Sequence, residues 1–337
     1  MSTVVFDADV LGRQRTGDET YALNLLRELG KLASEAEIRL VAVTRHPELV
    51  PPGVEPFELH ARWQELRMAW TLPRVLRSLP ADLCHTQYAL PFRAPCPCVV
   101  TVHDVSFARD SELMGRNDRM VFRLVVPHAV RHAARVLTVS HRTKSDLIDL
   151  YGVPEGRIVV TPNGVDPAFS PGQGSHDYVL SVGAIQARKN QLAALEAAAA
   201  VGLPLVVAGP AKDPDLASEL RDRGARVEGY VETARLAELY RGAACLVQTS
   251  LFEGFGLPVV EAMASGTPVV AVPDPALEEV AGGAAVLVDE SELAAGIRTA
   301  IAERERLVAA GLERVKAFEW RAAAERTLAV YREILGT

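Results

Sequence analysis

The chain has 337 residues with a net charge of −7, of which 49% are apolar and 23% are charged. These proportions are typical of globular proteins and exclude extensive disorder, and the length suits two domains of roughly 150 residues each. The negative charge argues against a nucleic-acid-binding protein. No apolar run reaches the ~18 residues that a membrane span needs.

The first half of the chain alternates short β-branched runs with amphipathic stretches. A glycine-containing loop, residues 11–20, separates the first predicted strand from the first predicted helix, and Ser140 is well placed to cap the last helix of this half. We predict strands at 3–6, 38–44, 82–86, 99–102, 136–139 and 158–160, and helices at 21–31, 64–79, 122–134 and 141–150.

A Pro/Gly/Ser-rich segment, SPGQGSHD at 170–177, predicts a linker, after which the alternation starts again. Such alternation indicates parallel sheets covered on both faces by helices. The predicted fold class is therefore α/β, with two Rossmann-like, doubly wound parallel-sheet domains that bind ligands beyond the carboxyl ends of their strands. The predicted strands of this half are 178–182, 205–208, 226–228, 245–248, 268–272 and 285–288, and a long amphipathic helix at 319–335 ends the chain.

The most informative segment is SLFEGFGLPVVEAMASGTP, residues 250–268. It follows a predicted strand and opens a helix, so Glu253 lies in the strand-to-helix loop and Glu261 lies on the helix. Gly254 and Gly256 allow a tight turn and a close approach to a ligand. Unpaired N–H groups at the start of a helix attract anions. The segment therefore offers two carboxylates to hydroxyl groups and a helix terminus to a phosphate.

This segment resembles the Glu-x7-Glu motif of the retaining glycosyltransferase family four, whose members have the two-domain GT-B fold. The agreement extends through the string EGFGLPxxEAMAxGxPVVA. The resemblance implies that Glu253 contacts the hydroxyls of the donor sugar and that Glu261 contacts the ribose of the nucleotide. It also implies that the backbone of Phe255, Gly256 and Leu257 holds the sugar and the diphosphate.

The resemblance further implies how the domains divide the work. Residues 1–168 would form the acceptor-binding domain and residues 169–317 the domain that binds the nucleotide sugar. Residues 318–337 would form a helix that crosses back to the first domain, and the active site would lie in the cleft between the domains.

A second motif, SVGAIQARKN at 181–190, is similar to the family pattern G-x-x-x-P-R-K-N, with Ala187 in place of the proline. Gly183 closes a predicted strand, and Arg188 and Lys189 follow at the start of a helix. A departing nucleoside diphosphate gains negative charge, which preorganised cations stabilise. We therefore expect both cations to be catalytic.

A third motif, VTVHDVSF, places His103 at the end of a predicted strand, and it resembles the strand-end His-Asp of the family. His103 would bind the donor sugar or the reacting face. As an alternative it would serve as a general base, which suits an inverting enzyme better.

Two weaker matches complete the predicted donor site. The family pattern R-T-G-I-G-R-Y reads R-T-G-D-E-T-Y here, so Gly17 is kept while Glu19 and Thr20 replace a glycine and a basic residue. Acidic groups near a diphosphate are unfavourable, and contact with the acceptor is an alternative for this loop. In EGYV, residues 228–231, Tyr230 and Val231 are placed to meet the nucleobase.

We expect no metal and no cofactor beyond the nucleotide sugar. The Asp-x-Asp triplets lie outside the predicted site, the histidines lack ligand spacing, and the four cysteines do not form metal-binding pairs. Arg188, Lys189 and the helix terminus can take the place of a cation.

The predicted function is transfer of a hexose, with retention of configuration, from a nucleotide-diphosphate sugar to a glycan or lipid-linked acceptor. GDP-mannose is the preferred donor, because the N-terminal pattern resembles mannosyltransferases of polysaccharide assembly. The alternatives are a UDP-hexose-dependent transferase, a sugar-nucleotide epimerase of the same fold and a noncatalytic sugar-nucleotide-binding subunit.

Two arginine-rich stretches suggest where the acceptor is found. Residues 62–77 carry Arg62, Arg67, Arg74 and Arg77 with two tryptophans, and residues 116–135 carry five more arginines. A cationic face with aromatic residues suits an anionic lipid-linked acceptor. Since the first residues do not resemble a signal peptide, we expect a cytoplasmic protein with peripheral contact to the inner face of the membrane.

Overall fold

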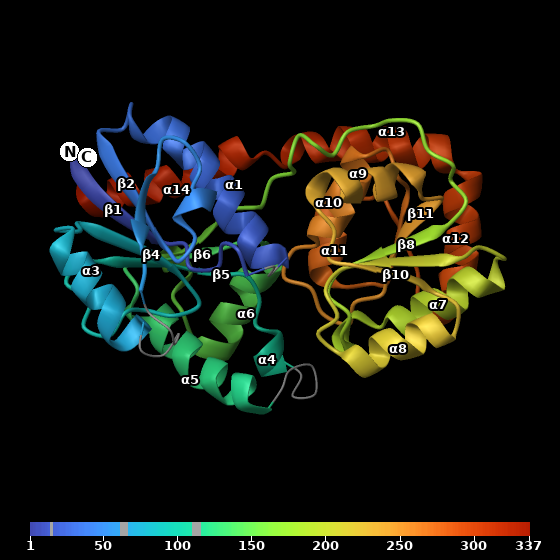
Figure 1. Ribbon diagram of the computed structural model, residues 1–337, viewed down its shortest axis with the longest axis horizontal. Coiled ribbons are helices and arrows are strands. Elements are labelled where there is room, and N and C mark those ends of the chain that lie inside the picture. Colours follow the sequence, from blue (N-terminus) through green and yellow to red (C-terminus); the bar gives the residue numbers. More distant parts are fainter. Residues whose placement is uncertain (14–15, 61–66, 110–115) are drawn as a thin grey trace. The chain divides into compact units, whose positions relative to one another are not determined.

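The computed structural model describes residues 1–13, 16–60, 67–109 and 116–337 and divides into two compact units (Figure 1). The first unit comprises Met1–Gly164 together with Trp320–Thr337, and the second comprises Val165–Glu319. Each unit contains one parallel sheet covered by helices, which confirms the predicted fold class. No helix in the described parts of the chain is both long enough and apolar enough to cross a membrane.

The sheet of the first unit has seven parallel strands in the order β3-β2-β1-β4-β5-β6-β7. Six of them match predicted strands. The exception is β3, an edge strand of sequence EPFE whose two glutamates are exposed; proline and charge are tolerated at a sheet edge but hide a strand from pattern analysis. The strands are β1 (Ser2–Asp7), β2 (Ile38–Thr44), β3 (Glu55–Glu58), β4 (Leu83–Gln87), β5 (Cys98–Val102), β6 (Arg135–Thr138) and β7 (Ile158–Val160).

Helices cover both faces of this sheet. The first helix packs against the C-terminal helix, which also contacts β4, and an apolar cluster that includes Leu72, Val75 and Leu76 of α3 fills the space under the sheet. The helices are α1 (Thr16–Ala33), α3 (Leu72–Ser78), α4 (Ser106–Arg109), α5 (Arg116–His132), α6 (His141–Tyr151) and α14 (Trp320–Leu335), with short 3₁₀ turns at Pro47–Leu49 and Glu155–Arg157.

Three helix predictions need correction. One concerns α5, which begins at Arg116, six residues before the predicted start at Phe122. The first helix begins at Thr16 rather than Tyr21, because Asp18 and Glu19 lie favourably in its first turn. The predicted helix 64–79 is a π-helical turn, Arg67–Thr71, followed by α3, and Pro73 lies near the start of α3, where a missing N–H is tolerated. The beginning of that predicted helix, including Arg62, lies outside the described residues.

The sheet of the second unit has six parallel strands in the order β10-β9-β8-β11-β12-β13, and all six were predicted within a residue or two. In both units the strand order reverses beside the first strand, between β1 and β4 and between β8 and β11, where open α/β sheets bind their ligands. The strands are β8 (Val179–Val182), β9 (Leu205–Ala208), β10 (Arg226–Gly229), β11 (Cys245–Gln248), β12 (Val269–Ala271) and β13 (Val286–Leu287).

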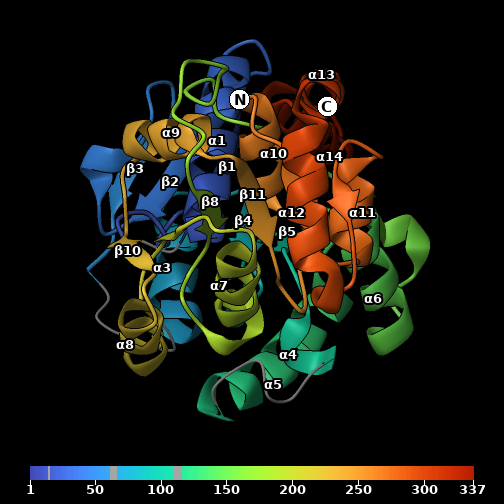
Figure 2. The same cartoon turned by 90° about the vertical axis from the view of Figure 1, so that its right-hand side faces the viewer.

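The helices of the second unit lie in two layers, and Figure 2 shows α7 and α12 of one layer side by side. One layer packs through a buried cluster of alanine, leucine and isoleucine side chains from α7, α8 and α12, while α10 contacts its neighbours α9 and α11 in the other. The helices are α7 (Gln191–Ala200), α8 (Pro214–Asp222), α9 (Thr233–Gly242), α10 (Leu257–Ala264), α11 (Pro275–Ala281), α12 (Leu293–Ala302) and α13 (Arg304–Arg314), with 3₁₀ turns at Ala187–Lys189, Glu290–Glu292 and Val315–Ala317.

Candidate active site

The loops after β8 and β11 meet at the point where the strand order of the second sheet reverses. Thr249, after β11, donates its hydroxyl to the carbonyl oxygens of Lys189 and Asn190, at 2.8 and 2.9 Å. Leu251 N donates to the carbonyl of Arg188 at 2.9 Å, and the Arg188 guanidinium donates to the carbonyl of Phe252 at 3.1 Å. The two loops that carry the strongest sequence motifs are therefore fixed against each other.

The backbone brings Lys189 into position through a 3₁₀ turn. Gly183 directly follows β8 and has a φ of +143°, a conformation that favours glycine, and the turn Ala187–Lys189 comes next. Gly183 lies close to the Lys189 side chain, which a β-carbon at position 183 would approach to 3.4 Å.

Glu253 is the centre of this arrangement. Its side chain is 9% exposed and forms an ion pair with Lys189, and its Oε1 accepts a hydrogen bond of 2.6 Å from Gln248. Burial alone would raise the pKa of Glu253, but the positive charges of Lys189 and Arg188 outweigh burial and lower the pKa to about 2. Glu253 therefore stays ionised across the neutral pH range, as a fixed acceptor for hydroxyl groups.

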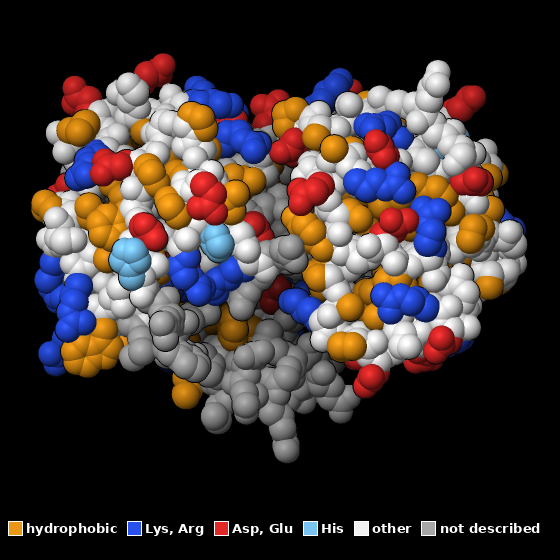
Figure 3. Space-filling view, viewed as in Figure 1, with side chains coloured by type: hydrophobic (Ala, Val, Ile, Leu, Met, Phe, Trp, Pro, Cys, Tyr) orange, Lys and Arg blue, Asp and Glu red, His pale blue; other side chains and the backbone are white. Residues whose placement is uncertain are grey.

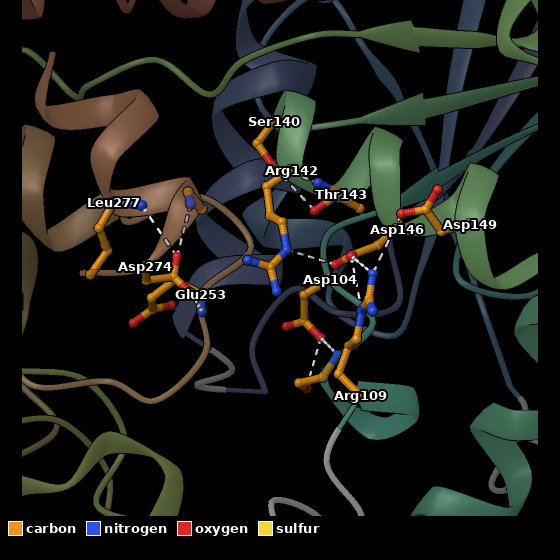
Figure 4. A network of polar contacts seen from close by, with 12 residues as sticks. Asp104, Arg109, Ser140, Arg142, Thr143, Asp146, Asp149, Glu253, Asp274 and Leu277 are labelled. Carbon is orange, nitrogen blue, oxygen red and sulfur yellow. Dashed lines mark hydrogen bonds and ion pairs between the residues drawn. The ribbon is translucent and has the colours of Figure 1, made fainter. Parts of the chain in front are cut away.

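The start of α10 lies directly after Glu253. Gly256 precedes the helix with a φ of +105°, and a β-carbon there would come within 2.8 Å of Leu277 Cδ2. Phe255 is buried, and Leu257 is the first helical residue. Asp274 supports the same loop from the neighbouring helix α11, as Figure 4 shows: it accepts from Ala276 N at 2.8 Å and from Glu253 N at 3.4 Å.

Glu261 lies one turn into α10 and is 8% exposed. Its Oε2 accepts a 2.8 Å hydrogen bond from the Tyr240 hydroxyl. Burial raises the pKa of Glu261 to about 7, although the Tyr240 hydrogen bond acts in the opposite direction. The two carboxylates of the Glu-x7-Glu motif thus have opposite electrostatic surroundings.

Tyr230 and Val231 follow β10, at the edge of the sheet. They are separated from β8 by β9, so they lie farther along the carboxyl edge than the Glu253 cluster. Tyr230 is 42% exposed.

His103 and Gly17 belong to the first unit. His103 lies at the end of β5 and its Nε2 is 2.7 Å from Gln87 Oε1, while its carbonyl accepts from the Thr143 hydroxyl at 3.0 Å. Burial lowers the pKa of His103 despite the nearby Asp18 and Asp104. Gly17 lies in the first turn of α1 with open space around its α-carbon.

Beyond His103, a second polar network organises the carboxyl edge of the first sheet (Figure 4). Asp146, which is 2% exposed, accepts from Arg142 Nε at 2.9 Å and from Arg109 Nε at 3.0 Å. Ser140 caps α6 as predicted, accepting from Thr143 N at 3.1 Å.

Sequence analysis missed three residues that support the site. Gln248 bonds Glu253, Asp274 bonds the Glu253 backbone, and Tyr240 bonds Glu261. An Asp-Pro pair is a helix-start signal that could have identified Asp274. Tyr240 is 21 residues from Glu261, and nothing in the local sequence pattern connects the two.

The prediction that the arginine-rich stretch 62–77 forms an exposed cationic face is wrong for one residue. Arg67, expected on an exposed cationic face, is 6% exposed and pairs with Asp7 and Asp9. Arg74 lies over the ring of Trp70 at 5.2 Å, and Trp70 is 57% exposed.

The strand order, the fixed loops and the paired carboxylates define a sugar-transferring enzyme of the GT-B type. The family model of Glycosyltransferase Family 4 matches residues 15–169, and that of Glycosyl transferases group 1 matches residues 168–313. The chain belongs to this glycosyltransferase family.

Two similar proteins of known name are glycosyltransferases. The chain is 29% identical over 327 residues to O-antigen chain mannosyltransferase B of Escherichia coli, covering 87% of this chain and 83% of the relative. It is 32% identical over 322 residues to D-inositol 3-phosphate glycosyltransferase 1 of Catenulispora acidiphila, covering 78% and 77%.

Two solved structures share the fold over the whole chain. Sucrose-phosphate synthase from Thermosynechococcus elongatus superposes with a TM-score of 0.79 at 19% identity, with 100% of both chains covered. HepE of Anabaena, solved in complex with UDP-glucose, gives a TM-score of 0.75 at 17% identity, with 99% of both chains covered.

Proposed function

We propose that this glycosyltransferase moves a hexose from a nucleotide-diphosphate sugar to a glycan or lipid-linked acceptor with retention of configuration. The observation that supports the proposal most directly is the buried Glu253, which is held ionised by Lys189 and Arg188 beside the start of α10. A carboxylate of this kind accepts sugar hydroxyls, while the cations and the helix terminus stabilise the departing diphosphate. In this proposal Glu261 binds the ribose and Tyr230 and Val231 bind the base.

GDP-mannose is the proposed donor, supported by the names of two similar proteins, the O-antigen mannosyltransferases of Escherichia coli and Salmonella typhimurium. A UDP-hexose is the second candidate, because HepE was solved with UDP-glucose. A thermal-shift panel of nucleotide sugars separates them, since a tight donor raises the melting temperature by mass action. A shift with neither GDP- nor UDP-sugars would refute both.

The proposed reaction needs no metal, because Arg188, Lys189 and the α10 terminus supply positive charge for the diphosphate. Transfer should therefore persist in EDTA, and NMR of the early product should show the anomeric configuration of the donor. Loss of activity in EDTA that Mg²⁺ restores would refute metal independence. Inversion of the anomeric configuration would refute retention and point to His103 as a general base. Incubation with donor alone identifies an epimerase, which needs no acceptor.

A lipid-linked acceptor at a membrane surface remains part of the proposal, with the exposed Trp70 and Arg74 as its support. Positive and negative side chains are interspersed on the face drawn in Figure 3. Attraction to an anionic membrane would therefore have to come from a local group of arginines. Sedimentation with anionic liposomes at low salt should decrease when Arg74 and Arg77 are changed to Gln. No sedimentation of the unmodified protein, with full activity on a soluble acceptor, would remove this part of the proposal.

A further inference from the structure

A cavity of about 100 Å³ opens in the first unit beyond the ends of β1 and β4. These strands are neighbours at the centre of the first sheet, where its strand order reverses (Figure 1). Ligands of open α/β sheets bind at such a point. The described residues that line the cavity all belong to the first unit.

Among the described residues, the arginines in the wall of this cavity are paired with carboxylates. Arg67 pairs with Asp7, and its Nε lies 3.2 Å from Asp9 Oδ2. Arg13 also pairs with Asp9, whose Oδ1 receives a further hydrogen bond of 2.8 Å from Arg45. A phosphate bound to these arginines would compete with the carboxylates that they already hold, which reduces the free energy gained on binding.

A third carboxylate makes the wall still less suited to an anion. Asp18 lies in the first turn of α1 and its side chain is 37% exposed, with its Oδ1 4.0 Å from His103 Nε2. Glu19, the other acidic residue of the altered RTGDETY motif, turns away and accepts from Gly12 N at 2.6 Å. Of the two acidic residues of this motif, Asp18 is therefore the one that lines the cavity.

The rest of the wall combines an aromatic ring with an amide. Tyr88 adopts a φ of +61°, which is costly for a bulky side chain and persists only where the surroundings enforce it. Its ring stands 5.3 Å from that of Phe122, and the neighbouring Gln87 bonds His103. Carboxylates and an amide can bind the hydroxyl groups of a sugar, and a flat aromatic ring can pack against its C–H face. The wall therefore carries the groups that recognise a sugar.

We propose that this cavity binds a neutral sugar ring of the acceptor and discriminates against a phosphorylated one. The inference rests on the proposed function, since the acceptor is the second substrate of that reaction. The cavity volume corresponds to about seven to ten water positions, which suits the hydroxyls of one ring rather than an extended chain. The relatives are named for both kinds of molecule, an O-antigen chain and an inositol phosphate, so the distinction separates two candidate classes of acceptor.

Saturation-transfer NMR on the full chain tests this without requiring catalysis. The probes are the methyl α-glycosides of mannose, glucose and galactose, each at the same concentration as mannose 6-phosphate. At least one glycoside should give ring-proton signals with the unmodified protein at least fivefold stronger than those of mannose 6-phosphate. Asp18→Asn should weaken the glycoside signals at least threefold, and Asp18→Lys should reverse the preference toward the phosphate.

Glu28→Gln is the matched control, because it removes a carboxylate from the same helix, one that pairs with Lys31 instead. It should behave as the unmodified protein does. Absence of glycoside signals, equal or stronger signals from mannose 6-phosphate, or indifference to both Asp18 substitutions would overturn the inference. Failure to transfer from any nucleotide sugar, with these signals intact, would instead refute the proposed function alone.

Discussion

Glu253 and Glu261 lie eight positions apart in the sequence, but their surroundings give them different protonation. Glu253 has two cations close by and is ionised, while Glu261 has a phenol donor and a buried position that favours the neutral acid. The motif spacing predicted that both would line one ligand. It could not predict this difference, because Lys189 and Tyr240 come from other elements of the fold.

Glu253→Gln should lower kcat about 100-fold or more, by the usual scale of preorganised charged groups, while nucleotide affinity changes less than threefold. The reason is that the carboxylate is proposed to meet the sugar rather than the base. Turnover and nucleotide titration of the same preparation provide the measurement, with Glu278→Gln, exposed on α11, as the control. Unchanged turnover would show that Glu253 does not contact the reacting sugar.

Glu261 predicts a pH dependence of stability. Burial raises the pKa of Glu261 to about 7 in the folded chain. Between the ordinary pKa of a glutamate and pH 7, the folded state therefore keeps a proton that the unfolded state has released. The free energy of unfolding falls as the pH rises through this range. Well above pH 7 the free energy of unfolding is lower by about 3 kcal/mol than at acidic pH. Glu261→Gln removes this dependence, so its melting temperature relative to the unmodified protein should be higher at pH 8 than at pH 5. An equal difference at both values would contradict the assignment.

At the scale of elements, the predicted strands match well because hydrophobic, β-branched runs are buried on both faces of parallel sheets. What failed were segments that carry charged residues, which the apolar pattern does not mark as part of a strand or a helix. The edge strand β3 pairs with β2 despite its two glutamates, and α1 begins five residues early, which moves Gly17 and Asp18 from a loop into a helix. The cavity wall that contains Asp18 could not be derived from spacing for the same reason.

Gly256 is the element-scale test of the α10 terminus. Gly256→Ala should lose about 2 kcal/mol or more, since it combines a φ of +105° with a 2.8 Å approach to Leu277 Cδ2. Gly224→Ala isolates the backbone contribution, because Gly224 has a φ of +95° with open space around it, and it should cost about 1 kcal/mol. Urea unfolding compares the two variants, and a nucleotide-induced thermal shift should weaken only for Gly256→Ala. If both variants lost the same free energy of unfolding, the contact with Leu277 would add no cost at Gly256, because the loop before α10 would relax.

At the scale of the whole molecule, the chain leaves its first unit after Gly164 and returns to it at Trp320. The returning helix α14 is tied in through a buried polar chain that also includes Tyr21. Tyr331 OH lies 2.5 Å from His85 Nδ1, and His85 Nε2 lies 2.7 Å from Thr101 Oγ1. Burial lowers the pKa of His85 to about 3, so the ring is neutral and needs a partner on both nitrogens.

Tyr331→Phe should therefore lower the stability of the protein by about 1 to 3 kcal/mol, the cost of one unpaired buried polar group. Glu333→Gln on the same helix breaks only the exposed pair with Arg135 and should cost less than about 1 kcal/mol. Because the residues proposed to bind the base, ribose and diphosphate of the nucleotide lie in the second unit, both variants should keep the nucleotide-induced rise in melting temperature. Calorimetry with and without nucleotide measures both quantities. If Tyr331→Phe were as stable as Glu333→Gln, the hydroxyl would not be needed to hold α14, and packing against α1 and β4 would be sufficient.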